Sequence, residues 1–340
     1  MFKRNSRIIL ISLVCLVATM NESEAQWFKR SQENDSSAET DQSRRRFVRE
    51  RLLQKRSHKS STNSESGSLQ TPDGRTRTYL IHVPPGYNKQ RLYPLILSFH
   101  GTGGQGAGQE KLSHFSTLAD REGFIVVYPD GIHKEWNDGR GDSHAEKEGI
   151  DDVQFVSLLI DHLIVESAVD PKRIYANGMS NGASFSHRLS CELSNKISGI
   201  GGVGSELGKN LSTKCNPERG IPVITFHGTA DPFSPYEGGK GSKGAEVLGA
   251  EENAFFHAQK NGCAGHPAVE NLPNRSNDGT NVTKISYTGC QNKADVVLYK
   301  INEGGHTWPG GNQYLPARTI GKTTRDINAS ELMWEFFKGR

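Results

Sequence analysis

One serine of the chain lies between two glycines, in the stretch Gly178-Met179-Ser180-Asn181-Gly182. Glycine at both positions removes the Cβ atoms that would collide in a sharp turn, and such a turn exposes the serine hydroxyl. The apolar run RIYANG at 173–178 precedes the serine, and a helical pattern at 182–193 follows it. A G-x-S-x-G sequence between a strand and a helix is typical of a nucleophile elbow, so Ser180 is the predicted nucleophile.

A serine hydroxyl needs a general base, and that base needs a carboxylate to orient it. When the order is serine, acid, histidine, the candidate bases are His257, His266 and His306. His306 follows the apolar run VVLYKI in the Gly-rich loop GGHTWPG, whereas the other two lie in a helical stretch and a polar loop. Asp231 leaves the end of a strand in VITFHGTADP. The sequence therefore predicts Asp231 as the acid and His306 as the base.

The same chemistry needs two N–H groups aimed at the oxyanion that forms during acyl transfer. The sequence F-H-G-T occurs at 99–102 and at 226–229, each time after an apolar run. The second copy leads to the acid, and the first continues into glycines like an oxyanion loop. We therefore expect the donors to be the main-chain N–H groups of Thr102 and Asn181. The histidines of the two copies, which we expect to be structural, are His100 and His227.

A pocket for an aryl ester needs flat apolar walls close to the nucleophile. Loop aromatics beside catalytic residues are better candidates for such walls than strand aromatics, which supply the core. The alternative is that each is an ordinary packing residue. The residues predicted to contact substrate are Trp136, Met179, Phe233, Tyr236 and Trp308.

These residues must be positioned by strands and helices that alternate along the chain. Near-continuous Val, Ile and Leu runs indicate a mostly parallel sheet covered on both faces, in one α/β domain. Helical patterns occur at 153–167 and 182–193. The expected strands are 78–85, 93–101, 122–131, 173–178, 221–228 and 295–305.

The segment before this domain has a different composition. Residues 1–25 combine a basic start, an apolar run at 8–17 and the small-x-small site Ser23-Glu24-Ala25, which together predict a secretory signal. Residues 26–68 are polar and contain the basic cluster SRRRFVRERLLQKRSHK, so we expect a disordered linker. The folded domain is expected at 69–340. The alternative is an uncleaved membrane anchor, which is disfavoured because the apolar run is shorter than a bilayer requires. No membrane span is expected after removal of the signal.

Charge and cysteine content narrow the class of protein further. Residues 26–68 hold 10 Lys and Arg against 6 Asp and Glu, so the excess positive charge of the chain, formally +3, lies outside the domain. Nothing in the charge of the domain itself indicates nucleic-acid binding. Four cysteines follow the signal, without the C-x-x-C spacing of a zinc site. In an oxidising compartment they are expected to form two disulfides between sequence neighbours, Cys191 with Cys215 and Cys263 with Cys290.

Seven motifs of the chain are HGTGG (100–104), YPDG (128–131), WNDGR (136–140), DDVQF (151–155), GMSNG (178–182), HGTADPFSPYEGG (227–239) and GGHTWPGG (304–311). With them, residues 69–340 resemble the secreted polyhydroxybutyrate-depolymerase-type esterases, a group that includes feruloyl and acetyl-xylan esterases. The resemblance implies an α/β-hydrolase fold, the triad Ser180, Asp231 and His306, and neither a cofactor nor a metal. Gln154 stands where the family usually has glycine.

The expected function is a secreted serine carboxylic ester hydrolase that works through an acyl-enzyme on feruloyl or acetyl esters of plant-type polysaccharide. The alternative is a depolymerase of poly(3-hydroxybutyrate) or its oligomers. A serine peptidase of the same fold would carry a gating domain, and a non-catalytic binding protein would not need a complete triad, so both are remote. The expected partner is the ester substrate, and the oligomeric state is left open.

Overall fold

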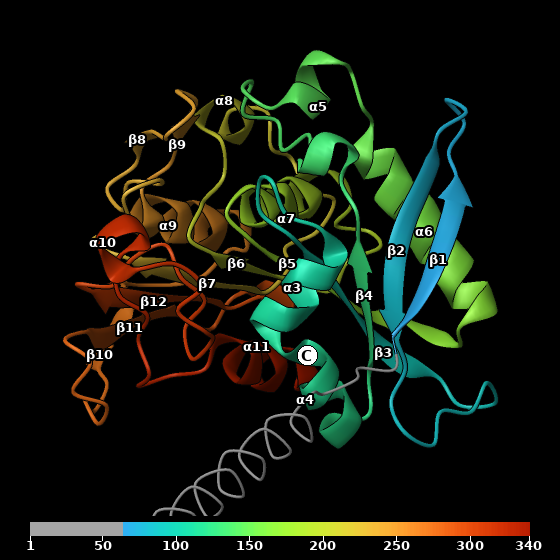
Figure 1. Cartoon of the computed structure of the whole chain (residues 1–340). Coiled ribbons are helices and arrows are strands. Elements are labelled where there is room, and N and C mark those ends of the chain that lie inside the picture. Colours follow the sequence, from blue (N-terminus) through green and yellow to red (C-terminus); the bar gives the residue numbers. More distant parts are fainter. Residues whose placement is uncertain (1–63) are drawn as a thin grey trace, which may run out of the picture. The chain divides into compact units, whose positions relative to one another are not determined.

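The computed structural model describes residues 64–340, which fold around one ten-stranded sheet (Figure 1). The strand order is β1-β2-β4-β3-β5-β6-β7-β12-β11-β10. The strands from β4 to β12 in this order run parallel, whereas β1, β2, β11 and β10 pair antiparallel at the two edges. The bounds are β1 Glu65–Gln70, β2 Thr76–His82, β3 Tyr93–Phe99, β4 Ile125–Pro129, β5 Val169–Met179, β6 Gly199–Val203, β7 Val223–Gly228, β10 Ala268–Asn271, β11 Asn281–Tyr287 and β12 Val296–Asn302.

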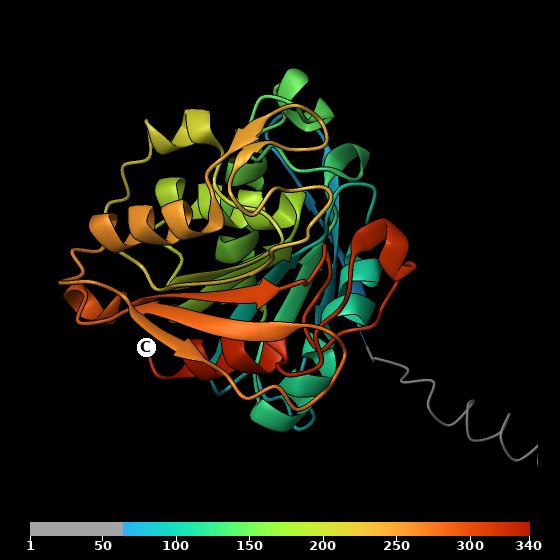
Figure 2. The same cartoon turned by 90° about the vertical axis from the view of Figure 1, so that its left-hand side faces the viewer.

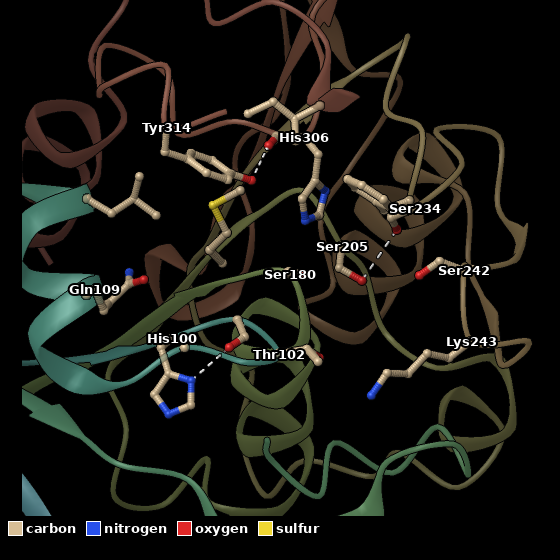
Figure 3. A pocket seen from close by; sticks show the side chains of 18 of the residues that line it. His100, Thr102, Gln109, Ser180, Ser205, Ser234, Ser242, Lys243, His306 and Tyr314 are labelled. Carbon is tan, nitrogen blue, oxygen red and sulfur yellow. Dashed lines mark hydrogen bonds between the residues drawn. The ribbon is translucent and has the colours of Figure 1, made fainter. Parts of the chain in front are cut away.

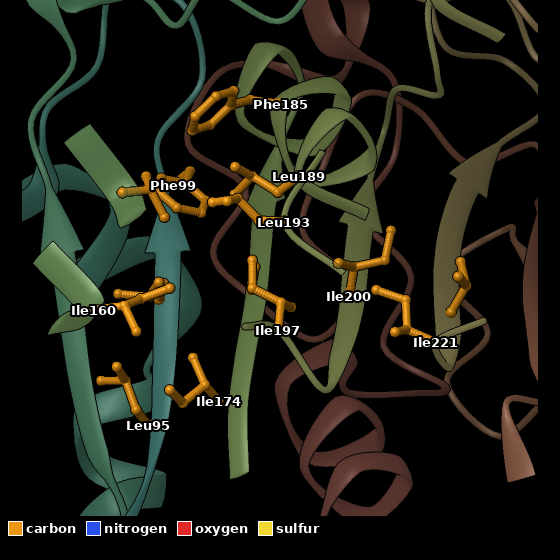
Figure 4. Close-up of a cluster of buried hydrophobic side chains, with 14 of the residues drawn as sticks. Leu95, Phe99, Ile160, Ile174, Phe185, Leu189, Leu193, Ile197, Ile200 and Ile221 are labelled. Carbon is orange, nitrogen blue, oxygen red and sulfur yellow. The ribbon is translucent and has the colours of Figure 1, made fainter. Parts of the chain in front are cut away.

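The sheet is buried on both faces because helices cover each of them (Figure 2). Alternate residues of β3 point to opposite faces, so that Leu95 and Leu97 enter one core and Ile96 enters the other. The first core packs against α6 and α7 and includes Phe185 and Leu189 (Figure 4). The principal helices are α3 Gly106–Ser113, α4 Phe115–Glu122, α6 Asp152–Glu166, α7 Asn181–Glu192, α9 Ala250–Lys260 and α11 Ala329–Lys338. The architecture is the predicted doubly wound α/β fold.

The six strands expected from the sequence are all present, within a few residues of their predicted ends. Strand β6 was not predicted, because its sequence GIGGV contains too little apolar character to signal a strand. Side chains of other elements occupy the space beside its glycines: a Cβ atom on Gly201 would lie 2.9 Å from the sulfur of Met333. A strand of glycines leaves room for side chains of neighbouring elements and carries few apolar side chains of its own. A search for apolar runs in the sequence therefore does not find it.

The start of the domain also differs from the expectation. Strand β1 runs from Glu65 and pairs with β2, so residues 65–68 belong to the sheet and not to a disordered linker. The expected linker contains too few apolar residues to indicate an edge strand, whose side chains are mostly exposed. The signal peptide predicted at 1–25 and the first part of the predicted linker, residues 26–63, lie outside the described residues.

Two disulfides tie loops to the sheet-bearing core. Cys191 in α7 is bonded to Cys215, and Cys263 after α9 is bonded to Cys290 after β11, which confirms the predicted pairing. Each bridge closes a loop of 24 or 27 residues in sequence separation. In the chain-entropy model, a disulfide that closes a loop of this length stabilises the folded state by roughly 3 kcal/mol. Within residues 64–340, no helix combines the length and apolar character needed to cross a membrane.

Candidate active site

Ser180 occupies the turn between β5 and α7 with φ 57° and ψ −123°, a backbone conformation that a non-glycine residue adopts only under constraint. The flanking glycines allow this turn. A Cβ atom on Gly178 would lie 2.4 Å from the carbonyl group of Gly182, and one on Gly182 would lie 2.4 Å from the main-chain oxygen of Phe99. The turn therefore needs glycine on both sides, and Ser180 stands at the N-terminus of α7, where the helix dipole favours negative charge.

Asp231 and His306 are joined by a hydrogen bond of 2.7 Å between Oδ2 and Nδ1. Because an ionised carboxylate only accepts, Nδ1 carries the proton and Nε2 is left to accept one. The other carboxylate oxygen of Asp231 accepts from the N–H groups of Phe233 and Ser234. Burial raises the pKa of Asp231, but the hydrogen bond from His306 and the neighbouring positive groups outweigh burial and hold that pKa below its usual range.

The loop that carries His306 is fixed on both sides. It follows β12 and packs against the end of β7 so closely that a Cβ atom on Gly228 would lie 2.3 Å from the oxygen of Gly304. The N–H of His306 donates to the oxygen of Ile320, and the hydroxyl of Tyr314 donates to the oxygen of His306 at 2.8 Å. The imidazole is therefore held in place by its main chain as well as by Asp231.

A pocket of about 470 Å³ contains Ser180 and His306 in its wall (Figure 3). Figure 3 shows Tyr314 and Gln109 on one side of the pocket and Ser242 and Lys243 on the other. The apolar part of the wall is formed by Leu112, Met179, Phe233, Tyr314, Leu315 and Ile320. The charged part is formed by Arg140, Asp142 and Lys243.

The two expected oxyanion donors flank the nucleophile. Within residues 64–340, neither the N–H of Thr102 nor that of Asn181 donates to a protein acceptor. Thr102 lines the pocket in a loop that is closed by a hydrogen bond from the N–H of Gly104 to the oxygen of Gly101. The side chain of Asn181 is turned away and bonds to the main chain of Trp136, which fixes the first turn of α7. Both main-chain N–H groups are thus free of protein acceptors among the described residues, as donors of an oxyanion hole must be.

Only two of the five predicted substrate contacts line the pocket. Phe233 is 37% exposed and sets its ring edge-to-face against the His306 imidazole at a centroid distance of 5.3 Å. Met179, although mostly buried, also lines the pocket. The prediction for the other three, Trp136, Tyr236 and Trp308, is corrected by their burial.

Each of these three side chains has a partner inside the protein. The Trp136 ring stacks on Phe185, and its Nε1 donates to the oxygen of His100. The Trp308 ring packs edge-on against Phe115, and its Nε1 donates to Ser330. The hydroxyl of Tyr236 hydrogen-bonds to Glu251. A loop position near a catalytic residue therefore does not by itself direct a ring into the pocket.

Tyr314 and Leu315 were not predicted, although they are 43% and 46% exposed and line the pocket. Tyr314 lies in the loop that follows His306, so the criterion that selected Trp308 would have found it if extended by a few residues. Leu112 is in α3, like Gln109, and also lines the pocket. Among the described residues, no group of three or more His, Cys, Asp or Glu side chains is arranged to hold a metal ion.

The chain is similar to known esterases. Residues 77–212, which include Ser180 and Thr102 but end before Asp231, match the family described as Esterase PHB depolymerase. The chain is 32% identical over 240 residues to Feruloyl esterase B of Piromyces equi, a match that covers 68% of this chain and 42% of that relative. The chain thus spans less than half the length of that relative. It is 29% identical over 279 residues to NocK of Nocardia uniformis subsp. tsuyamanensis, covering 78% and 80% of the two chains.

A solved structure shares the fold. The acetyl xylan esterase from Aspergillus awamori superimposes with a TM-score of 0.51 at 14% sequence identity, over 72% of this chain and 94% of that structure. At this identity the similarity concerns the α/β fold alone.

Proposed function

Because the chain belongs to the family of polyhydroxybutyrate-depolymerase-type esterases and is a carboxylic ester hydrolase, we propose that it is a secreted serine esterase for feruloyl or acetyl esters of plant-type polysaccharide. One observation carries the proposal: Ser180 on its strained turn and His306, which is hydrogen-bonded to Asp231, line the same pocket. A structural serine would not need this backbone strain.

In the first half of the reaction, Nε2 of His306 takes the proton of the Ser180 hydroxyl while Oγ attacks the ester carbonyl carbon. The carbonyl oxygen becomes an oxyanion, which the N–H groups of Thr102 and Asn181 stabilise. The tetrahedral intermediate then collapses. The bond to the alcohol oxygen breaks, His306 returns its proton to that oxygen, and the acid stays bound to Ser180 as an acyl-enzyme.

In the second half, a water molecule gives a proton to His306 and attacks the acyl carbon through the same oxyanion. Collapse releases the carboxylic acid and restores the Ser180 hydroxyl. Asp231 keeps its negative charge throughout, and it stabilises the imidazolium that forms in each half. The lowered pKa of Asp231 supports this role, because the carboxyl stays ionised through the neutral range.

The composition of the pocket wall supports an aromatic acyl group. Phe233 and Tyr314 expose large parts of their rings beside His306, and Leu112 and Leu315 extend the apolar surface. These walls can accept a planar ring, which gains from apolar burial and from edge-to-face contact. The charged part of the wall, at Arg140 and Lys243, can donate hydrogen bonds to the sugar hydroxyls of the alcohol portion.

The test compares kcat/KM of the full chain for methyl ferulate, acetylated xylan and soluble hydroxybutyrate oligomers. The Ser180→Ala variant provides the background rate. We expect methyl ferulate and acetylated xylan to be cleaved faster than the oligomers, and we expect the Ser180→Ala variant to be inactive on all of them. Cleavage of the oligomers without cleavage of the other two esters would favour the depolymerase instead. Equal rates for the wild type and Ser180→Ala would remove the serine mechanism.

A further inference from the structure

A buried cluster of three histidines and one acid lies beside the triad, and the mechanism above does not use it; its members are His187, His227, His257 and Glu206. Glu206, which follows β6, is buried and contacts three side chains. Its Oε1 lies 3.1 Å from Nδ1 of His227, and its Oε2 accepts from Asn253 and lies 3.3 Å from Nε2 of His187. His227 in turn lies behind the acid, with its Nε2 3.7 Å from Oδ2 of Asp231. That oxygen is the one bonded to His306.

The hydrogen bonds of His227 define its charge. Nδ1 faces the carboxylate of Glu206, and Nε2 faces the main-chain oxygen of Ser234 at 3.0 Å. When Glu206 is ionised, both partners only accept hydrogen bonds, so both ring nitrogens carry a proton. A neutral imidazole would then leave one buried nitrogen lone pair against an acceptor. Beside an ionised Glu206, this geometry defines an imidazolium at His227.

The histidine of the other F-H-G-T copy has the opposite pattern. Nδ1 of His100 donates to the oxygen of Gly101 at 2.8 Å, and Nε2 accepts from the N–H of Gly131 at 3.0 Å. One donor and one acceptor describe a neutral imidazole. Both histidines thus bind neighbouring loops, as the sequence predicts, but in different charge states.

We propose that Glu206 holds His227 as a fixed imidazolium behind Asp231, and that this positive charge lowers the pH at which His306 becomes an active base. His227 does not line the pocket, so it is a positioning residue and not a catalytic one. The proposal rests on the proposed function, because it concerns the base of that reaction. Its physical cause is that a cation next to Asp231 weakens the stabilisation that Asp231 gives to protonated His306.

The ionisation of the neighbouring groups supports this charge assignment. Burial lowers the pKa of His227, but hydrogen bonding to Glu206 and the charge of Asp231 outweigh it and raise that pKa. Burial raises the pKa of Glu206, but its bonds to His187 and His227 outweigh it and lower that pKa. For His100, burial prevails and lowers the pKa.

Other titratable groups face His227 from the elements around it. From the loop after β7, Tyr236 sets its ring edge against the imidazole at a centroid distance of 5.7 Å, and burial raises the pKa of its phenol well above the usual range. In α9, Nε2 of His257 lies 3.0 Å from Nδ1 of His187, the histidine that contacts the other carboxylate oxygen of Glu206. Burial lowers the pKa of His257 well below its usual value, so His257 is neutral. Glu206 and Asp231 are thus the charged groups in direct contact with His227.

The test uses the full chain and two variants, His227→Gln and the double variant Glu206→Gln with His227→Gln. The double variant replaces the ion pair by two neutral amides of similar shape, so it avoids a lone buried charge and keeps the experiment usable if the single variant fails to fold. Imidazole ¹⁵N NMR gives the charge state directly. We expect one histidine with both nitrogens protonated from pH 6 to pH 8, and we expect its signal to vanish in both variants.

The kinetic test measures kcat/KM against pH. In the variants, the acid limb, which reports protonation of His306, should move to higher pH by about half a unit to one unit. KM above that limb should stay within about twofold, because the pocket is unchanged. The control is His100→Gln, which removes a neutral histidine of the same motif. It can reduce kcat, but it should leave the acid limb in place.

Two results would overturn the proposal. One is a neutral His227 at pH 7 in the NMR spectrum of the wild type. The other is an acid limb that stays in place in a folded double variant. The NMR measurement does not depend on turnover, and the titration of His306 can also be followed by NMR. A chain that cleaves no ester would therefore contradict the proposed function without deciding the charge of His227.

Discussion

Gly178 and Gly182 approach so closely that a Cβ atom on the first would lie 2.4 Å from both carbonyl atoms of the second. The opposing atoms are main chain and cannot rotate away. Gly178→Ala should therefore distort the turn, with a loss of about 1–3 kcal/mol in the free energy of unfolding and a large fall in turnover. Denaturant unfolding and an ester assay check both parts. Gly339→Ala, which adds a Cβ into open space, is the matched control and should change neither.

The proposed triad predicts that its variants lose activity without losing stability. Ser180→Ala and His306→Ala should each reduce turnover by about 10⁴-fold or more, and Asp231→Asn by somewhat less, because the three residues act as a unit. The melting temperature of Ser180→Ala should not fall, because the variant removes only a hydroxyl. Activity of Ser180→Ala near the wild-type level would exclude Ser180 as the nucleophile.

The pocket walls make a prediction about the acyl group. Tyr314→Ala and Phe233→Ala remove partly exposed ring surface beside His306, so KM for methyl ferulate should rise about tenfold, with a smaller effect on an acetyl ester. Steady-state kinetics on the two esters gives this ratio. The control is Phe255→Ala, since Phe255 is 50% exposed on α9 and does not line the pocket. An equal rise in KM for both esters would contradict an aromatic acyl site.

The edge strand β1 makes a prediction about the start of the domain. A chain truncated to 64–340 should keep the melting temperature and the ester activity of the full chain, because it retains all of β1. A chain truncated to 71–340 leaves β2 without its antiparallel partner. Its melting temperature should fall by at least about 4 °C, which corresponds to about 1–2 kcal/mol for a domain of this size. Equal melting temperatures of the two truncated chains would show that β1 does not contribute to stability.

Buried neutral His257 makes a prediction about acid stability. Its folded-state pKa lies well below the unfolded value, so the unfolded chain takes up a proton first as the pH falls through about 6.5. The free energy of unfolding should therefore fall between pH 6.5 and pH 5, and His257→Gln should make that fall smaller. Urea unfolding at several pH values measures the slope. His266→Gln, at an exposed position, should leave the slope unchanged.

The sequence was most informative where chemistry requires a fixed motif. Ser180 could be predicted because the turn admits only glycine on both sides, and Asp231 and His306 because each leaves the end of an apolar strand. The pocket walls could not be predicted in the same way. Trp308 lies two residues after the base, but its ring turns into the core against Phe115 and Ser330, and only tertiary packing decides that direction. Strand β6 was missed for a related reason. Three of its five residues are glycines, and side chains of other elements, such as Met333, occupy the space beside them.

The parallel pairing of β12 with β7 has a consequence for synthesis of the chain. Ser180, Thr102 and Asn181 are made before either of their chemical partners, and His306 reaches them only when β12 has docked beside β7. In the proposed mechanism, a ribosome-bound chain that ends near residue 290 therefore carries the nucleophile without its base. Hydrolytic capacity would then appear only after almost the whole domain has been synthesised, because His306 is among the last parts of the site to be made.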